Sequence, residues 1–92
     1  MIVGRFRKAP GDKLDYTLLY EQWLDGDTID TSSFTIPPGL SSAGTATKTD
    51  TTTTVWIQGG TSGKTYTVSN TIVTTNATPR TKVVTFELEI LP

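Results

Sequence analysis

The feature that most constrains the fold is an alternation of apolar and polar residues near the C-terminus. Apolar residues occupy every second position of the last stretch: Val84, Phe86, Leu88 and Ile90. An earlier stretch has the same period, with Tyr66, Val68 and Ile72 in phase and Asn70 interrupting them. A period of two is that of a β-strand with one buried face. Because turn-forming residues occupy 76–79, we predict that the two stretches pair as an antiparallel hairpin.

A further strand is predicted upstream of this hairpin. Threonine, which is β-branched and suits a pleated surface, fills 20 of the 92 positions and favours an all-β chain. Residues 53–57 read as a strand that ends at Gly59 and Gly60. We expect Val55 and Ile57 to lie on its buried face.

Residues 28–36 form another predicted strand, which two prolines at 37 and 38 stop. Ile29 and Phe34 differ in parity, so they cannot share one face of a regular strand. This change of parity predicts a β-bulge near residues 32–33.

Residues 12–24 fit two periods. A helix would align four residues on one stripe: Tyr16, Leu19, Tyr20 and Trp23. A strand would align a different set: Leu14, Tyr16, Leu18 and Tyr20. We favour the strand because Tyr and Thr are enriched in strands and the rest of the chain already commits the fold to sheet. The helix stays open as the alternative.

Taken together, these segments predict an all-β protein with one domain over residues 1–92. The predicted architecture is a single immunoglobulin-like β-sandwich of about seven short antiparallel strands. In such sandwiches a tyrosine at the start of the penultimate strand bonds to upstream backbone, and Tyr66 suits that role. We expect seven residues to have structural roles: Tyr16, Trp23, Phe34, Tyr66, Phe86, Leu88 and Ile90.

Charge and composition exclude several classes of function. The chain has no His and no Cys, so the usual zinc ligands, imidazole bases and thiol nucleophiles are missing, and we expect no enzyme activity and no cofactor. A net charge of −1 is not that of a nucleic-acid binder. The longest apolar run is too short for a membrane span or a secretory signal, so we expect a soluble protein.

Two loops resemble ligand sites only superficially. Aspartates gather around Asp25 and Asp27, but the later ligands of a calcium-binding EF-hand loop are missing, and a solvated turn explains them without a metal. Residues 59–64 contain glycines and Lys64 but lack the spacing of a phosphate-binding loop. We therefore predict no metal site.

The segment 41–54 is rich in Ser and Thr and poor in apolar residues. We interpret it as a solvated loop and edge strand, with an arm that orders on a partner as the alternative. Candidate interface residues are Trp56 and the neighbouring Thr51, Thr52 and Thr53.

Four stretches resemble a family of short virion structural proteins of tailed bacteriophages, described as fibre-to-tail adaptors. They are KLDY at 13–16, WL at 23–24 together with GDTI at 26–29, TVWIQGGTSGKTYTV at 54–68 and FELEI at 86–90. The resemblance implies an immunoglobulin-like fold and a particle-assembly role, with no catalytic residue to transfer. The chain departs from the family pattern in the threonine tract 51–54 and at 78–80.

From this resemblance we expect a protein of the virion, made in the bacterial cytoplasm, that docks on the tail or head-to-tail region and seats another tail or fibre component. Its partners would be tail, fibre, portal-adaptor or capsid proteins, in several copies set by particle symmetry, with neither nucleic acid nor membrane bound directly. Capsid decoration is the alternative, and a carbohydrate-binding or adhesion module using Trp56 is a third interpretation.

Overall fold

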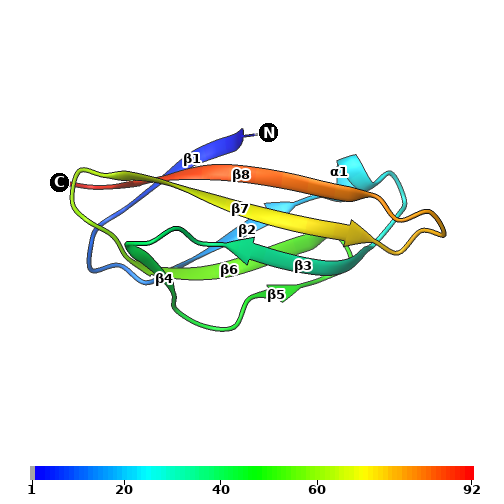
Figure 1. The fold of residues 1–92 in the computed structure, drawn as a ribbon, viewed down its shortest axis with the longest axis horizontal. Helices are drawn as coiled ribbons and strands as arrows, with labels where there is room; N and C mark the ends of the chain where they lie inside the picture. Colours follow the sequence, from blue (N-terminus) through cyan, green and yellow to red (C-terminus); the bar gives the residue numbers. More distant parts are fainter. Residues whose placement is uncertain (1) are drawn as a thin grey trace.

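The computed structural model describes residues 2–92, with side chains from residue 4 onward. The described chain forms eight strands and one short helix: β1 Ile2–Lys8, β2 Leu14–Leu19, α1 Glu21–Leu24, β3 Ile29–Thr35, β4 Leu40–Ser42, β5 Thr47–Lys48, β6 Thr52–Gly59, β7 Thr65–Thr74 and β8 Thr81–Ile90 (Figure 1). The all-β prediction is confirmed, with eight strands where about seven were expected. No helix in this part of the chain is long and apolar enough to cross a membrane.

The strands form two sheets that share one core. The first, here the β8 sheet, has the order β1-β8-β7-β3, and the second, the β6 sheet, has the order β2-β6-β4 with β5 also pairing with β6. The prediction of antiparallel strands is wrong for β1, which runs parallel to β8 because it joins the sheet of the last strand and does not pair with the next strand in the chain, β2. The other described pairs are antiparallel. The molecule is elongated, 46 by 23 by 18 Å. In Figure 1, α1 and the β7–β8 loop lie at one end and the C-terminus at the other.

The predicted C-terminal hairpin is confirmed. β7 and β8 pair antiparallel over nine residue pairs, from Thr65↔Glu89 to Val73↔Thr81. Their even-numbered residues face the core: Val68, Ile72, Phe86, Leu88 and Ile90 are all 0% exposed. The burial of Val55 and Ile57 on β6 is confirmed as well.

The structure divides residues 12–24 between the two alternatives. β2 extends from Leu14 to Leu19, and Tyr16 and Leu18 face the core, as the favoured strand predicts. Residues 21–24 form a single helical turn, α1, which carries Trp23. This turn ends at Asp25 and Gly26, both with positive φ, which glycine adopts without strain.

The predicted position of the bulge in the 28–36 strand is wrong by a few residues. The register of β3 against β7 shifts between Ile29 and Thr31, whereas residues 32–35 pair regularly. Ile29 is 1% exposed, and Phe34 is partly buried against the same core. The bulge therefore corrects the parity at the start of the strand, where the chain leaves the turn after α1.

The residue that interrupts the alternation, Asn70, is fully buried and joins the two sheets. Its Oδ1 accepts hydrogen bonds from Tyr20 Oη at 2.6 Å and Thr53 Oγ1 at 2.9 Å. Its Nδ2 donates to Ser32 Oγ and to the Ser33 carbonyl, both at 2.9 Å. All of its polar atoms are thus satisfied, which is the condition under which a core tolerates an amide. We refer to these five residues as the Asn70 network.

A second polar link lies at the opposite end of the core. Lys8, at the end of β1, is 1% exposed. Its ammonium donates to the carbonyl of Gly59 at 2.6 Å, of Ala9 at 2.8 Å and of Pro10 at 3.4 Å. The three N–H donors of the lysine match three backbone acceptors. This link ties β1, in one sheet, to the end of β6 in the other.

The Ser/Thr-rich segment 41–54 is divided among three strands. It contains the end of β4, the two-residue β5 and the start of β6. β5 is an exposed edge strand that pairs with residues 53–54 of β6. The tight turn before β6 is closed by a hydrogen bond from the Thr49 N–H to the Thr52 carbonyl at 2.9 Å.

Candidate functional site

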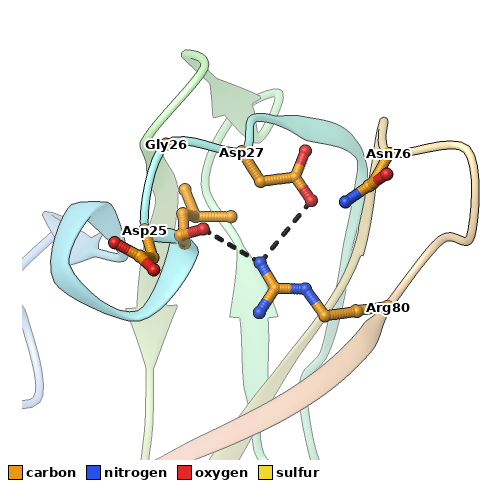
Figure 2. Close-up of a pocket in the computed structure, with 6 residues that line it drawn as sticks. Asp25, Gly26, Asp27, Asn76 and Arg80 are labelled. Atoms are coloured by element: carbon orange, nitrogen blue, oxygen red, sulfur yellow. Dashed lines mark hydrogen bonds and ion pairs between the residues drawn. The ribbon is translucent and has the colours of Figure 1, made fainter.

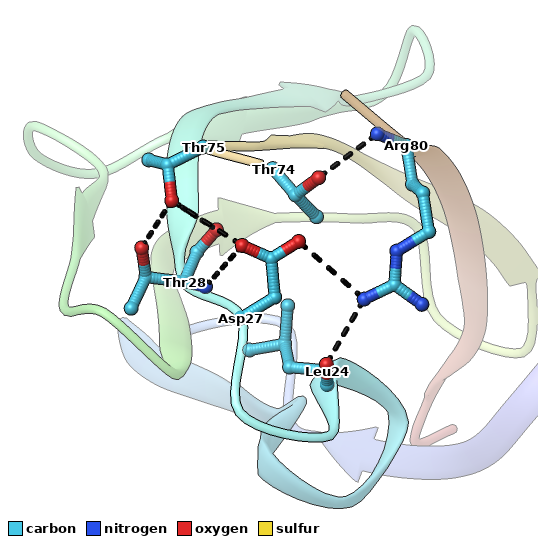
Figure 3. A network of polar contacts seen from close by, with 6 residues as sticks. All are labelled: Leu24, Asp27, Thr28, Thr74, Thr75 and Arg80. Carbon is cyan, nitrogen blue, oxygen red and sulfur yellow. Dashed lines mark hydrogen bonds and ion pairs between the residues drawn. The ribbon is translucent and has the colours of Figure 1, made fainter. Parts of the chain in front are cut away.

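At the α1 end of the molecule, an arginine from the β7–β8 loop holds the helical turn in place. Arg80 Nη2 donates to the carbonyl of Leu24 at 2.9 Å and forms an ion pair with Asp27 Oδ2 at 3.5 Å (Figure 3). The Arg80 N–H in turn donates to Thr74 Oγ1 at 2.8 Å. Arg80 therefore links the turn after α1, through its guanidinium, to the end of β7, through its backbone N–H.

Asp27 is oriented by further donors in the same place. Its Oδ1 accepts a hydrogen bond from the Thr28 N–H at 2.8 Å and one from Thr75 Oγ1 at 3.3 Å. The Thr28 hydrogen bond, together with the Thr75 hydroxyl and the charge of Arg80, lowers the pKa of Asp27 below its ordinary value. The carboxylate is thus charged and committed to protein partners.

The hollow around this pair is open and polar (Figure 2). It is lined by Leu24, Asp25, Gly26, Asp27, Asn76 and Arg80. The described residues contain no group of three or more side chains that could hold a metal ion. We conclude that the Asp27–Arg80 pair stabilises the turn between α1 and β3.

The same arginine positions Trp23, the aromatic residue of α1. The Arg80 guanidinium carbon lies 4.5 Å from the centroid of the Trp23 ring, and Lys82 Nζ lies 5.4 Å from it. A cation over an indole ring is attracted by the negative potential of the ring face. Trp23 is partly buried and packs against the core, so α1 is fixed beside the start of β8.

Trp23 forms one wall of an apolar groove between the edges of the two sheets. The groove encloses about 260 Å³ and is lined by Phe6, Thr17, Leu18, Leu19, Tyr20, Trp23, Lys82 and Val84. We call it the edge groove. Leu19 is 80% exposed and Phe6 is 37% exposed, so apolar surface at this place is accessible. Sites of this character are where proteins bind partners.

The sequence-predicted interface residues do not form one cluster. Trp56 is 38% exposed and lies on the outer face of β6, and Thr52, at intermediate exposure, has the same parity. Thr51 lies in the turn before β6, where its carbonyl accepts a hydrogen bond from the Tyr20 N–H.

The assignment of Thr53 to an interface is wrong. Its side chain is 0% exposed and bonds to Asn70. The alternation of β6 turns Thr53 inward together with Val55.

The residues expected to be structural lie in or against the core. Phe86, Leu88 and Ile90 are fully buried, and Tyr16 is 7% exposed. The other three are partly buried and pack on the core: Trp23, Phe34 and Tyr66.

Tyr66, near the start of β7, accepts a hydrogen bond at its hydroxyl from the Thr61 N–H, five residues upstream, at 3.1 Å. A Cβ at Gly39 would lie 2.8 Å from that hydroxyl, so the close approach of the Tyr66 ring to residue 39 requires glycine there.

The edge groove was not anticipated from the sequence, although one signal points to it. Leu18 and Leu19 are neighbours in a strand, so their side chains point to opposite faces of the sheet. Because only one of these faces is covered by the core, one of the two leucines is exposed. Phe6 and Val84 carry no comparable local signal, because their position in the groove depends on pairing between β1 and β8.

Comparison with known proteins finds no curated protein that matches the chain. A family model described as podophage GP4 fiber-tail adaptor protein gp77 matches residues 8–89, which includes all strands except most of β1 and the last residue of β8. The resemblance found in the sequence is thereby confirmed, and the chain belongs to the podophage fibre-tail adaptor family.

Proposed function

We propose that this protein docks on the tail or head-to-tail region of a podophage particle and seats another tail or fibre component there. The family match over residues 8–89 carries this proposal. The match gives no support to capsid decoration, the alternative considered from the sequence. Exposed apolar side chains beside open strand edges, as in the edge groove, suit a protein whose task is to bind other proteins.

We further propose that the fold is an immunoglobulin-like sandwich. The orders β2-β6-β4 and β3-β7-β8 correspond to the B-E-D and C-F-G orders of that fold. The bond between Tyr66 and upstream backbone supports the same interpretation, because such a tyrosine corner is characteristic of these sandwiches. β1 pairs with β8, so the first strand lies on the sheet of the last one.

The outer face of β6 is a proposed contact surface within this function. Trp56 is exposed there, and Thr52 and Thr54 lie on the same face of the strand. A large aromatic side chain that is flanked by threonines supplies a large contact area, and fixing it in a complex costs little conformational entropy. Trp56→Ala should therefore weaken incorporation into particles without loss of folding, which thermal unfolding of the purified variant would check.

The deciding experiment is quantitative mass spectrometry of purified virions, with the major capsid protein as the internal standard. A docking role on the tail predicts a copy number set by tail symmetry, roughly a dozen per particle. Copies in the hundreds, or complete absence from particles that are otherwise intact, would contradict the proposal. A non-structural phage protein, measured in the same samples, is the control for contamination.

A further inference from the structure

One strand edge in this molecule is open and unprotected. Within the described chain, β2 pairs only with β6. The Tyr20 N–H donates to the Thr51 carbonyl on the β6 side. Since backbone groups of an antiparallel strand alternate in direction, the N–H and C=O groups of Asp15, Thr17 and Leu19 point away from β6. β2 therefore presents three residues with free donors and acceptors along one side.

The other edge strands carry features that discourage pairing. β1 contains Arg5, Arg7 and a register shift, and β3 has the shift after Ile29. β4 and β5 are only three and two residues long. Charges, bulges and short length are the usual means by which edges avoid further strands. β2 has six residues in unbroken register, no Lys, Arg or Pro, and a single charge at Asp15.

The edge groove lies directly beside this open edge. Thr17, Leu18 and Leu19 of β2 line it, opposite Lys82 and Val84 of β8. A strand laid along β2 would direct every second side chain toward the groove and the remaining ones toward the outer face. The groove would receive apolar side chains beside Phe6 and Trp23. Lys82, which has no carboxylate partner among the described ion pairs, would meet an acidic residue near the end of that strand.

A second copy of this chain does not satisfy these requirements. In a two-fold pairing of β2 with itself, each strand would offer Tyr16 and Leu18 on its inner face, and both are already buried in their own core. No side chain would be free to enter the groove of the partner. The groove instead needs a segment that is not already part of a sheet, with side chains free on both faces.

We propose that the free edge of β2 takes an extended segment of a different virion protein as an added strand. This segment has apolar residues at alternate positions, which fill the edge groove, and an acidic residue that faces Lys82. The proposal rests on the proposed function, since it identifies the surface through which the adaptor holds one of its partners. Backbone hydrogen bonds supply affinity in this mode of binding, and the alternate side chains supply specificity.

A photo-crosslinking experiment in assembled particles tests the proposal directly. The photo-reactive residue p-benzoylphenylalanine replaces Leu19, and in a matched control it replaces Leu91, which is exposed at the other end of the molecule. Purified virions are irradiated, and crosslinked peptides are identified by mass spectrometry. We expect position 19 to capture a segment of another virion protein with the alternating pattern, and position 91 not to capture it. A crosslink from position 19 to a second copy, or none, would overturn the inference.

A pair of substitutions at one position tests the role of the backbone. Thr17→Pro removes an N–H that points away from β6, whereas Thr17→Val keeps it, and both remove the hydroxyl bond to Thr54. Relative to Thr17→Val, Thr17→Pro should lower the number of copies in purified virions by about tenfold or more. Equal copy numbers for the two variants would overturn the proposal. If circular dichroism shows that Thr17→Pro does not fold, the crosslinking experiment decides.

The adaptor role and the β2 docking site can be tested separately. If wild-type particles lack the chain, the proposed function is wrong. If particles contain the chain, but position 19 captures no other protein while the same photo-reactive residue at Trp56 does, the adaptor role stands and the β2 edge is not its docking site.

Discussion

The Asn70 network offers the sharpest test of how the two sheets are held together. We predict that Asn70→Ala destabilises the protein strongly. The substitution removes the acceptor of two buried hydroxyls, those of Tyr20 and Thr53, which are 4% and 0% exposed. It also removes the amide donor to the Ser32 hydroxyl and the Ser33 carbonyl of β3.

The size of the effect follows from the cost of leaving buried polar groups without partners, about 1 to 3 kcal/mol each. With two hydroxyls orphaned and a small cavity left behind, we expect a loss of about 3 to 5 kcal/mol in the free energy of unfolding. The total free energy of unfolding of a small domain is about 5 to 15 kcal/mol. The variant should therefore be close to the limit of folding at room temperature.

Equilibrium urea denaturation, followed by far-ultraviolet circular dichroism, measures this loss. Ser69→Ala is the matched control, because Ser69 is the preceding residue of β7 and only partly buried, and it should change stability by less than about 0.5 kcal/mol. Tyr20→Phe in both backgrounds completes a double-mutant cycle, with an expected coupling of about 1 kcal/mol or more between Tyr20 and Asn70. A loss below about 1 kcal/mol for Asn70→Ala, or additive effects in the cycle, would refute the reasoning.

Three further predictions concern the core and the α1 end. Phe86→Ala should cost about 3 to 5 kcal/mol in urea denaturation, because the ring is fully buried; a loss under about 1 kcal/mol would mean that this face is exposed. Tyr16→Phe should be neutral or slightly stabilising because the buried Tyr16 hydroxyl has no hydrogen-bond partner among the residues that the structure describes, whereas Tyr20→Phe should destabilise. Equal effects of the two substitutions in thermal unfolding would contradict this difference. The lowered pKa of Asp27 contributes stability that is complete above its unfolded-state pKa of about 3.9 and is lost as the pH falls through the lower folded-state pKa. Stability measured at pH 6 and at pH 3 should therefore differ less in Asp27→Asn than in the wild-type protein, and an unchanged difference would show that the Thr28 and Arg80 contacts do not act on this carboxylate.

Local sequence patterns predict only part of the candidate site. The apolar residues on either side of Trp56, Val55 and Ile57, indicate that Trp56 is exposed, because neighbouring residues of a strand face opposite sides. The prediction that Thr53 lies at an interface is wrong, because a tract of threonines has the composition of a solvated surface even where one of its residues faces the core. Its burial depends on Asn70, which lies 17 residues away and provides the acceptor its hydroxyl needs.

The sequence by itself determined five of the strands, β2, β3, β6, β7 and β8. It also determined the C-terminal hairpin and the inward face of both strands of that hairpin. It could do so because the alternation of side chains along a strand is a local property, read from neighbouring residues. It also carried enough of the family pattern for membership to be recognised.

Only the tertiary structure decided which edges remain open and what lies beside them. The edge groove combines Phe6, Leu19 and Val84, which come from three strands, and the link from Tyr20 to Asn70 spans 50 positions. Such contacts depend on the pairing of distant strands, and pairing is selected by the packing of the whole core. A local pattern specifies which side of a strand is apolar, but the assembled sheets determine whether its edge has a neighbour.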